Sequence, residues 1–200
     1  MRILVIRHGE SEADLLDVHE GRADYELTER GHRQADAMAC YVKENYVLSA
    51  IYCSPLRRAY QTATHLCERT GMVITLDAKL MEFNNGLIAG LKRAIAQERY
   101  PVVEDLPAHA SVYEQESMLE FRFRADYVLS KIISETASDA TIAIVTHGGM
   151  INQLYRSFLR LPVDSDIFFA TGDTGIHEWQ ITKDRRLIVN ANITAHTKGI

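Results

Sequence analysis

The stretch Ile3-Leu4-Val5-Ile6-Arg7-His8-Gly9-Glu10 decides how this chain folds. Four consecutive apolar residues predict a strand that is buried on both faces of a sheet. An arginine, a histidine and a glycine follow at once, so polar chemistry stands at the carboxyl end of that strand. In open α/β sheets, ligands bind in the crevice outside this end of the strands. The sequence therefore indicates a functional site that begins at Arg7 and His8.

A second stretch also has an apolar run that is followed directly by a histidine and a glycine. Residues 141–146 read Thr-Ile-Ala-Ile-Val-Thr and are followed by His147-Gly148-Gly149. We interpret this run as another central strand with polar chemistry at its end. If the two strands lie side by side and parallel, His8 and His147 meet at one crevice.

The rest of the chain alternates between strand and helix patterns. Thr28 is a candidate N-cap for an amphipathic helix, and Ser117 with Glu120 matches a capping box. This alternation predicts an α/β fold, a three-layer α/β/α sandwich with a mostly parallel sheet and an antiparallel edge. We expect strands at 3–7, 51–53, 73–76, 141–146, 175–181 and 187–191, and helices at 28–42, 56–70, 92–98, 117–136 and 150–159.

Length and composition predict one domain over residues 1–200, with a cap insertion at about 79–114 that lies over the active site. The net charge of −5 argues against a nucleic-acid partner, which usually needs a basic face. No apolar run approaches the ~20 residues of a membrane span, so we expect no membrane partner and a cytoplasmic protein. The three cysteines, an odd number without metal-like spacing, are expected to be free thiols.

Two more stretches carry charged residues close to turn or helix-start signals. Ser54-Pro55-Leu56-Arg57-Arg58-Ala59 places arginines near the start of a predicted helix, where a guanidinium can bind an anion together with backbone N–H groups. Leu80-Met81-Glu82 is followed by Gly86 and Gly90, and Glu82 taken alone is typical of a surface carboxylate. Arg57 alone is better explained as a solvated position on the helix surface.

These four stretches, in this order, resemble the signature of the histidine phosphatase superfamily, which includes the cofactor-dependent phosphoglycerate mutases. The resemblance implies a phosphoglycerate mutase-like fold and a phosphohistidine formed at His8, with Glu82 as general acid and base. It implies no metal and no resident cofactor. The catalytic and phosphate-binding set that it implies is Arg7, His8, Arg58, Glu82, His147 and the backbone N–H of Gly148.

The same residues suit phosphoryl transfer on chemical grounds. The transition state spreads charge over three equatorial oxygens, so it needs cationic and N–H donors around it and a nucleophile in line. His8 has to be neutral in order to attack. A hydrogen bond from its Nδ1–H to a backbone carbonyl would fix that tautomer and leave Nε2 free.

Some positions depart from the family's usual pattern. Asp14 stands where many relatives carry Asn, and a carboxylate there repels a phosphate dianion unless it is protonated, paired with an arginine or turned away. Ala89 stands where phosphatase relatives often have Glu. Ser11 and Arg93 look mutase-like and are further candidate binding residues, although Lys92 and Arg93 equally suit an exposed helix face.

The sequence favours a phosphatase that acts on a small phosphorylated metabolite. A phosphoglycerate mutase, which would use 2,3-bisphosphoglycerate as its cofactor, is the alternative enzyme. It is disfavoured because residues 97–116 contain Arg99 as their only arginine or lysine. A silent module that binds phosphorylated ligands is the alternative without catalysis, disfavoured because the implied catalytic set is complete. Homodimers occur in the family, but no stretch of this sequence identifies an interface.

Overall fold

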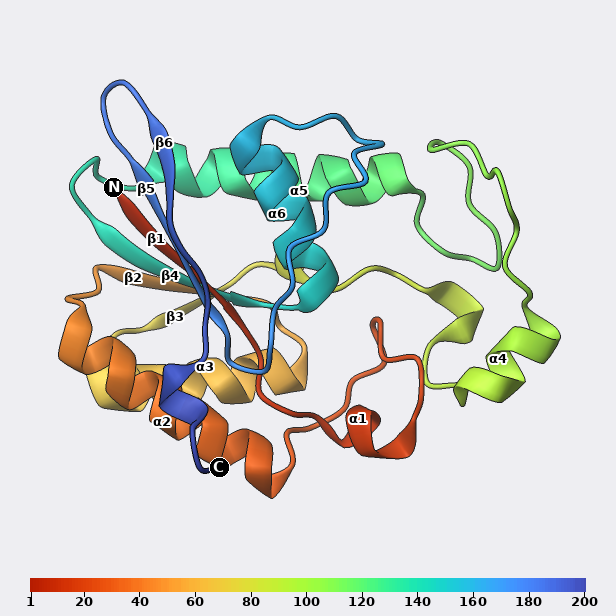
Figure 1. Ribbon diagram of the computed structural model, residues 1–200, viewed down its shortest axis with the longest axis horizontal. Helices are drawn as coiled ribbons and strands as arrows, with labels where there is room; N and C mark the ends of the chain where they lie inside the picture. Colours follow the sequence, from red (N-terminus) through yellow and green to blue (C-terminus); the bar gives the residue numbers. More distant parts are fainter.

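A six-stranded sheet with helices on both faces forms the centre of the computed structural model, which describes residues 1–200 (Figure 1). This confirms the predicted α/β class. None of the helices has the length and apolar character needed to span a bilayer. The strands are β1 (Arg2–Arg7), β2 (Ala50–Cys53), β3 (Ile74–Leu76), β4 (Thr141–Thr146), β5 (Ile176–Ile181) and β6 (Arg186–Ile193), and the α-helices are α1 (Glu12–Leu16), α2 (Glu29–Asn45), α3 (Arg57–Thr70), α4 (Arg93–Arg99), α5 (Met118–Glu135) and α6 (Gly148–Leu159).

The strand order is β3-β2-β4-β1-β5-β6. The first four of these strands pair in parallel, whereas β5 runs antiparallel to β1 and β6 antiparallel to β5. In the β1/β4 pair, Arg7 lies opposite Thr146, and the His8 amide donates to the Thr146 carbonyl at 3.0 Å. The two apolar strands are therefore neighbours, as predicted, and His8 and His147 leave the sheet side by side.

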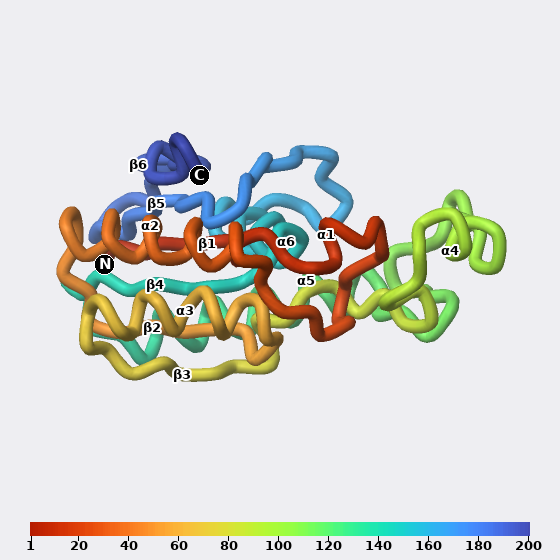
Figure 2. The backbone as a smooth tube through the Cα atoms, turned by 90° about the horizontal axis from the view of Figure 1, so that it is seen from below, coloured from red at the N-terminus to blue at the C-terminus, as the bar shows by residue number.

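Helices α2 and α3 cover one face of the sheet, and α5 and α6 cover the other (Figure 2). The alternation along β1 explains why both faces need a helical layer. Ile3 and Val5 pack into the core with α5 and α6, while Leu4 and Ile6 pack into the core with α2 and α3. All four side chains are fully buried. Burial of each contributes about 1.5–3 kcal/mol, so the strand that carries the site is firmly anchored.

Most helix ends lie where the sequence predicts them. The Thr28 side chain accepts from the Gly31 amide at 2.9 Å, and Ser117 forms the expected capping box at the start of α5. Helix α6 differs, because it begins at Gly148 rather than at 150, with His147 as its N-cap. The two glycines continue the helix here instead of ending a loop. The small size of Gly149 is needed for the close approach of another segment, described below.

The proposed cap occupies the chain between β3 and α5 and contains α4. Both views place α4 at one end of the molecule, beyond α1 (Figures 1 and 2). The cap is tied to the loop after β1, since the His19 amide donates to the Leu91 carbonyl at 2.9 Å and the Gly90 amide to the His19 carbonyl at 2.8 Å. The cap and this loop thus form one unit. That the cap lies over bound substrate stays a prediction.

Candidate active site

His8 and His147 form the centre of the site. Both rings are buried, and their centroids are 5.1 Å apart. His8 Nδ1 lies 2.8 Å from the Gly9 carbonyl oxygen. Since a carbonyl can only accept, Nδ1 carries the proton and Nε2 keeps its lone pair. This is the backbone hydrogen bond that the sequence predicts for a nucleophilic histidine.

Arg58 lies against the nucleophilic face of His8. It comes from the first turn of α3 and is fully buried, and its Nε donates to His8 Nε2 at 3.3 Å. Its two terminal nitrogens donate to the carbonyls of Ala23 and Gly21 at 3.0 and 2.8 Å. Arg57 instead pairs with the exposed Glu26 at 2.8 Å, outside the site. The structure therefore brings Arg58, and not Arg57, to the histidine.

His147 presents an unpaired donor. Its Nε2 lies 2.7 Å from Ser54 Oγ, and the Leu56 amide donates to the same oxygen at 3.3 Å. We assign the Ser54 proton to the hydrogen bond with Nε2, an assignment that places the proton of His147 on Nδ1. That nitrogen is buried without a partner. An unsatisfied buried donor costs about 1–3 kcal/mol, so it suits a site where a ligand supplies the acceptor.

Arg7 is held by the loop before β5. Its Nη1 donates to the Thr171 carbonyl at 3.1 Å and lies 3.4 Å from Asp173 Oδ1. Its Nε is buried and has no partner. Arg7 thus keeps a free N–H in the site while its guanidinium charge is partly balanced.

Burial and nearby cations keep both histidines neutral. Burial lowers the pKa of His8 well below its usual value, and the charges of Arg58 and Arg7 lower it further. The pKa of His147 is also lowered well below its usual value, by burial first and then by Arg58. A neutral His8 whose Nε2 carries no proton has the protonation state of a nucleophile at neutral pH.

Glu82 is positioned by backbone groups from two segments. One carboxylate oxygen accepts from the Phe83 amide and the other from the Gly149 amide, both at 2.8 Å. Arg124 from α5 donates to the Glu82 carbonyl at 3.1 Å, and Arg22 from the loop after β1 donates to it at 3.4 Å. The carboxyl group is therefore fixed at the start of α6, next to His147.

Gly149→Ala is expected to reduce any turnover that uses Glu82 by about 10- to 100-fold, the effect of misplacing a reacting group by an ångström. A Cβ at residue 149 would lie 2.4 Å from Glu82 Oε1, so the carboxyl group would have to move. At Gly148 the added Cβ would meet nothing closer than Thr171 Cγ2 at 3.7 Å. Steady-state kinetics should therefore show a much smaller loss for Gly148→Ala. Equal losses in the two variants would contradict this account of Gly149.

The remaining predicted binding residues lie in different surroundings. Ser11 is buried at the start of α1, and the Asp14 carboxylate accepts from the Ser11 amide at 2.9 Å and lies 3.1 Å from the Ser11 hydroxyl oxygen. Asp14 thus faces the start of its own helix. Arg93 is exposed and pairs with Asp17 at 3.0 Å, so the structure does not bring it to His8.

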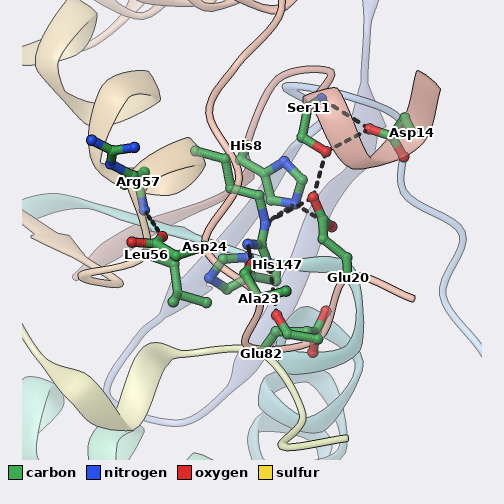
Figure 3. Close-up of polar contacts among 12 residues, drawn as sticks. His8, Ser11, Asp14, Glu20, Ala23, Asp24, Leu56, Arg57, Glu82 and His147 are labelled. Atoms are coloured by element: carbon green, nitrogen blue, oxygen red, sulfur yellow. Dashed lines mark hydrogen bonds and ion pairs between the residues drawn. The ribbon is translucent and has the colours of Figure 1, made fainter. Parts of the chain in front are cut away.

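The sequence did not reveal Ser54 or Glu20 as parts of the site. Ser54 lies in the stretch quoted for Arg58, directly after a predicted strand. Polar residues at the ends of neighbouring parallel strands meet at one edge of a sheet, and this signal places Ser54 near His147. Glu20 lies in a loop without any pattern. Its carboxylate points toward His8 and Ser11 (Figure 3). One oxygen is 3.2 Å from Arg58 Nε and contacts Ser11 Oγ, and the other is 3.7 Å from His8 Nε2.

Comparison with known proteins agrees with this geometry. The chain is 31% identical to the glucosyl-3-phosphoglycerate phosphatase of Mycobacterium tuberculosis, over 89% of this chain and 83% of that protein. It is 25% identical to phosphoserine phosphatase 1 of Hydrogenobacter thermophilus, over 98% and 94% of the two chains. The solved structure of a mycobacterial glucosyl-3-phosphoglycerate phosphatase in complex with VO3 superposes with a TM-score of 0.82 and 28% identity, covering 95% of this chain and 99% of that one.

The family model of the histidine phosphatase superfamily, branch 1, matches residues 3–194. This match includes both central strands except Arg2, and every candidate site residue described above. The chain belongs to the histidine phosphatase superfamily.

Proposed function

We propose that this protein is a phosphatase that hydrolyses a small phosphomonoester through a phosphohistidine at His8. The observation that carries the proposal is the state of His8. Its Nδ1–H is held by a backbone carbonyl at 2.8 Å, and its Nε2 lone pair faces Arg58. Free donors at Arg7 Nε and His147 Nδ1 complete a site for the oxygens of a phosphoryl group.

In the first step, His8 Nε2 attacks phosphorus and the bond from phosphorus to the ester oxygen breaks. Arg7, Arg58, His147 and the Gly148 amide stabilise the charge on the three equatorial oxygens. The Gly148 amide lies in the first turn of α6, where N–H groups have no partner within the helix. Glu82 gives its proton to the departing oxygen, and an alcohol leaves.

In the second step, a water molecule attacks the phosphohistidine. Glu82, now ionised, takes a proton from this water as the new oxygen–phosphorus bond forms and the nitrogen–phosphorus bond breaks. Inorganic phosphate leaves, His8 returns to its neutral state and Glu82 is protonated again. The cycle consumes one phosphomonoester and one water and needs no added cofactor.

Two observations favour hydrolysis over phosphoglycerate mutation. Arg93, which would hold mutase substrate, pairs with Asp17 on the surface. Arg99 is the only arginine or lysine of residues 97–116, so the cap offers little for a second phosphate. The relatives described above are also named phosphatases. Phosphoserine and glucosyl-3-phosphoglycerate both carry a carboxylate near the phosphate, and we propose that substrates of this class be tested first.

The test is a paired assay on one preparation. Phosphate release is measured from a panel that includes phosphoserine, glucosyl-3-phosphoglycerate and simple alkyl phosphates. Interconversion of 3- and 2-phosphoglycerate is measured with 2,3-bisphosphoglycerate present. We expect phosphate release with little isomerisation. Fast isomerisation with little phosphate release would replace the proposal by the mutase alternative.

A further inference from the structure

The Glu20 carboxylate stands directly in front of the nucleophile. Its Oε2 lies 3.7 Å from His8 Nε2, and its Oε1 lies 3.2 Å from Arg58 Nε. The same Oε1 accepts from the hydroxyl of the buried Ser11. The carboxylate thus meets a cationic donor, a hydroxyl donor and the nucleophile, which are groups that a phosphoryl group would meet.

This position conflicts with bound substrate. A reacting phosphorus has to come within about 3–3.5 Å of His8 Nε2, and its oxygens extend further around that point. The Glu20 carboxyl group lies at a similar distance from the same atom, 3.7 Å, and so competes for this space. It also shares Arg58 Nε–H, which a phosphoryl oxygen would need. A second anion at this distance would repel the dianion of a phosphomonoester as well.

We propose that Glu20 is the resident occupant of the phosphoryl subsite, an internal anion that substrate displaces and that returns when inorganic phosphate leaves. The proposal rests on the phosphatase function argued above. It makes Glu20 a specificity-determining residue, because a ligand has to bring enough binding energy from the rest of its structure to displace the carboxylate. Inorganic phosphate has no organic portion to supply this binding energy, so the carboxylate displaces it from the site.

Two further features of Glu20 agree with a carboxylate that can move out of the phosphoryl subsite into solvent. About a fifth of the side chain is exposed, at 19%, whereas the Arg58 side chain beside it is fully buried, so Glu20 has access to solvent. Burial raises the pKa of Glu20, and the charge of Arg58 opposes this shift. The carboxylate is therefore poorly hydrated in its present position and regains water when it swings outward.

A purely structural role for Glu20 predicts a different result. As a brace between Ser11 and Arg58, Glu20 would keep the phosphate-binding groups in place, and its removal would weaken phosphate binding. As a competitor, its removal strengthens phosphate binding. The sign of the change in affinity therefore separates the two roles.

The experiment measures binding of inorganic phosphate by calorimetry and its inhibition constant in turnover assays. Glu20→Gln keeps the shape of the side chain without its charge, and Glu20→Ala removes the carboxyl group without adding a donor. Glu26→Gln is the control, because this exposed carboxylate makes the same charge change outside the site, beside Arg57. Thermal melts establish that each variant is folded.

We expect both Glu20 variants to bind phosphate about tenfold or more tightly than the wild type, as for a subsite that is blocked nine-tenths of the time. Glu26→Gln should match the wild type. Unchanged or weaker binding in folded Glu20→Gln and Glu20→Ala would overturn this inference alone. A site that binds no phosphate in any variant would overturn both this inference and the phosphatase proposal.

Discussion

His8→Ala should lower kcat for phosphomonoester hydrolysis by at least about 10³-fold, because removal of a covalent nucleophile leaves only binding and electrostatic stabilisation. The protein should remain folded, since the β1 residues that anchor the sheet are unchanged. Rapid acid-free quenching with substrate labelled at phosphorus should trap phosphohistidine in the wild type and none in the variant.

His109→Ala is the matched control, because this histidine is exposed in the cap and far along the chain from the site. It should keep wild-type turnover and wild-type labelling. If His8→Ala retained turnover, the phosphohistidine mechanism would be wrong. If it lost turnover but still carried label, another residue would be the nucleophile.

Glu82→Gln is the change with the second largest expected effect. Loss of a general acid should reduce kcat for alkyl phosphates by about 10²- to 10⁴-fold. With p-nitrophenyl phosphate the leaving group needs no proton, so formation of the phosphoenzyme should stay fast. Hydrolysis of the phosphoenzyme still needs Glu82 as the general base. Rapid mixing should therefore show one equivalent of p-nitrophenol released in a burst, followed by slow turnover.

The exposed cap residue Glu104 provides the control, and Glu104→Gln should behave as the wild type with both substrates. In Glu82→Gln, the oxygen of the new side-chain amide can still accept from the Gly149 amide, while the hydrogen bond that the other carboxylate oxygen accepts from the Phe83 amide is lost. Equal losses of burst and steady-state rate would show that Glu82 is needed for binding or for folding of the site, and not for proton transfer.

The centre of the site follows from the sequence because it depends on local patterns. The apolar runs before His8 and His147 identify two buried strands, and parallel strands of this kind lie in the middle of an α/β sheet. Arg58 and Glu82 lie in motifs whose order along the chain could be compared with a known family. Each of these four residues lies where the structure brings the site together.

The periphery could not be predicted because it depends on contacts between distant segments. Glu20 reaches His8 only because the loop after β1 is held by Arg58, whose terminal nitrogens bind the carbonyls of Gly21 and Ala23. Arg93 pairs with Asp17, 76 residues earlier in the chain, and no local pattern indicates this contact.

The place of β1 in the sheet has a consequence for folding kinetics. The strand that delivers the nucleophile lies between β4 and β5, which come from residues 141–146 and 176–181. Contacts of such long sequence separation are slow to form, because the loss of chain entropy precedes the gain from pairing. During synthesis, β1 emerges early and has to wait for both partners. The active site should therefore be among the last parts of the protein to form, and appearance of activity should report completion of the sheet.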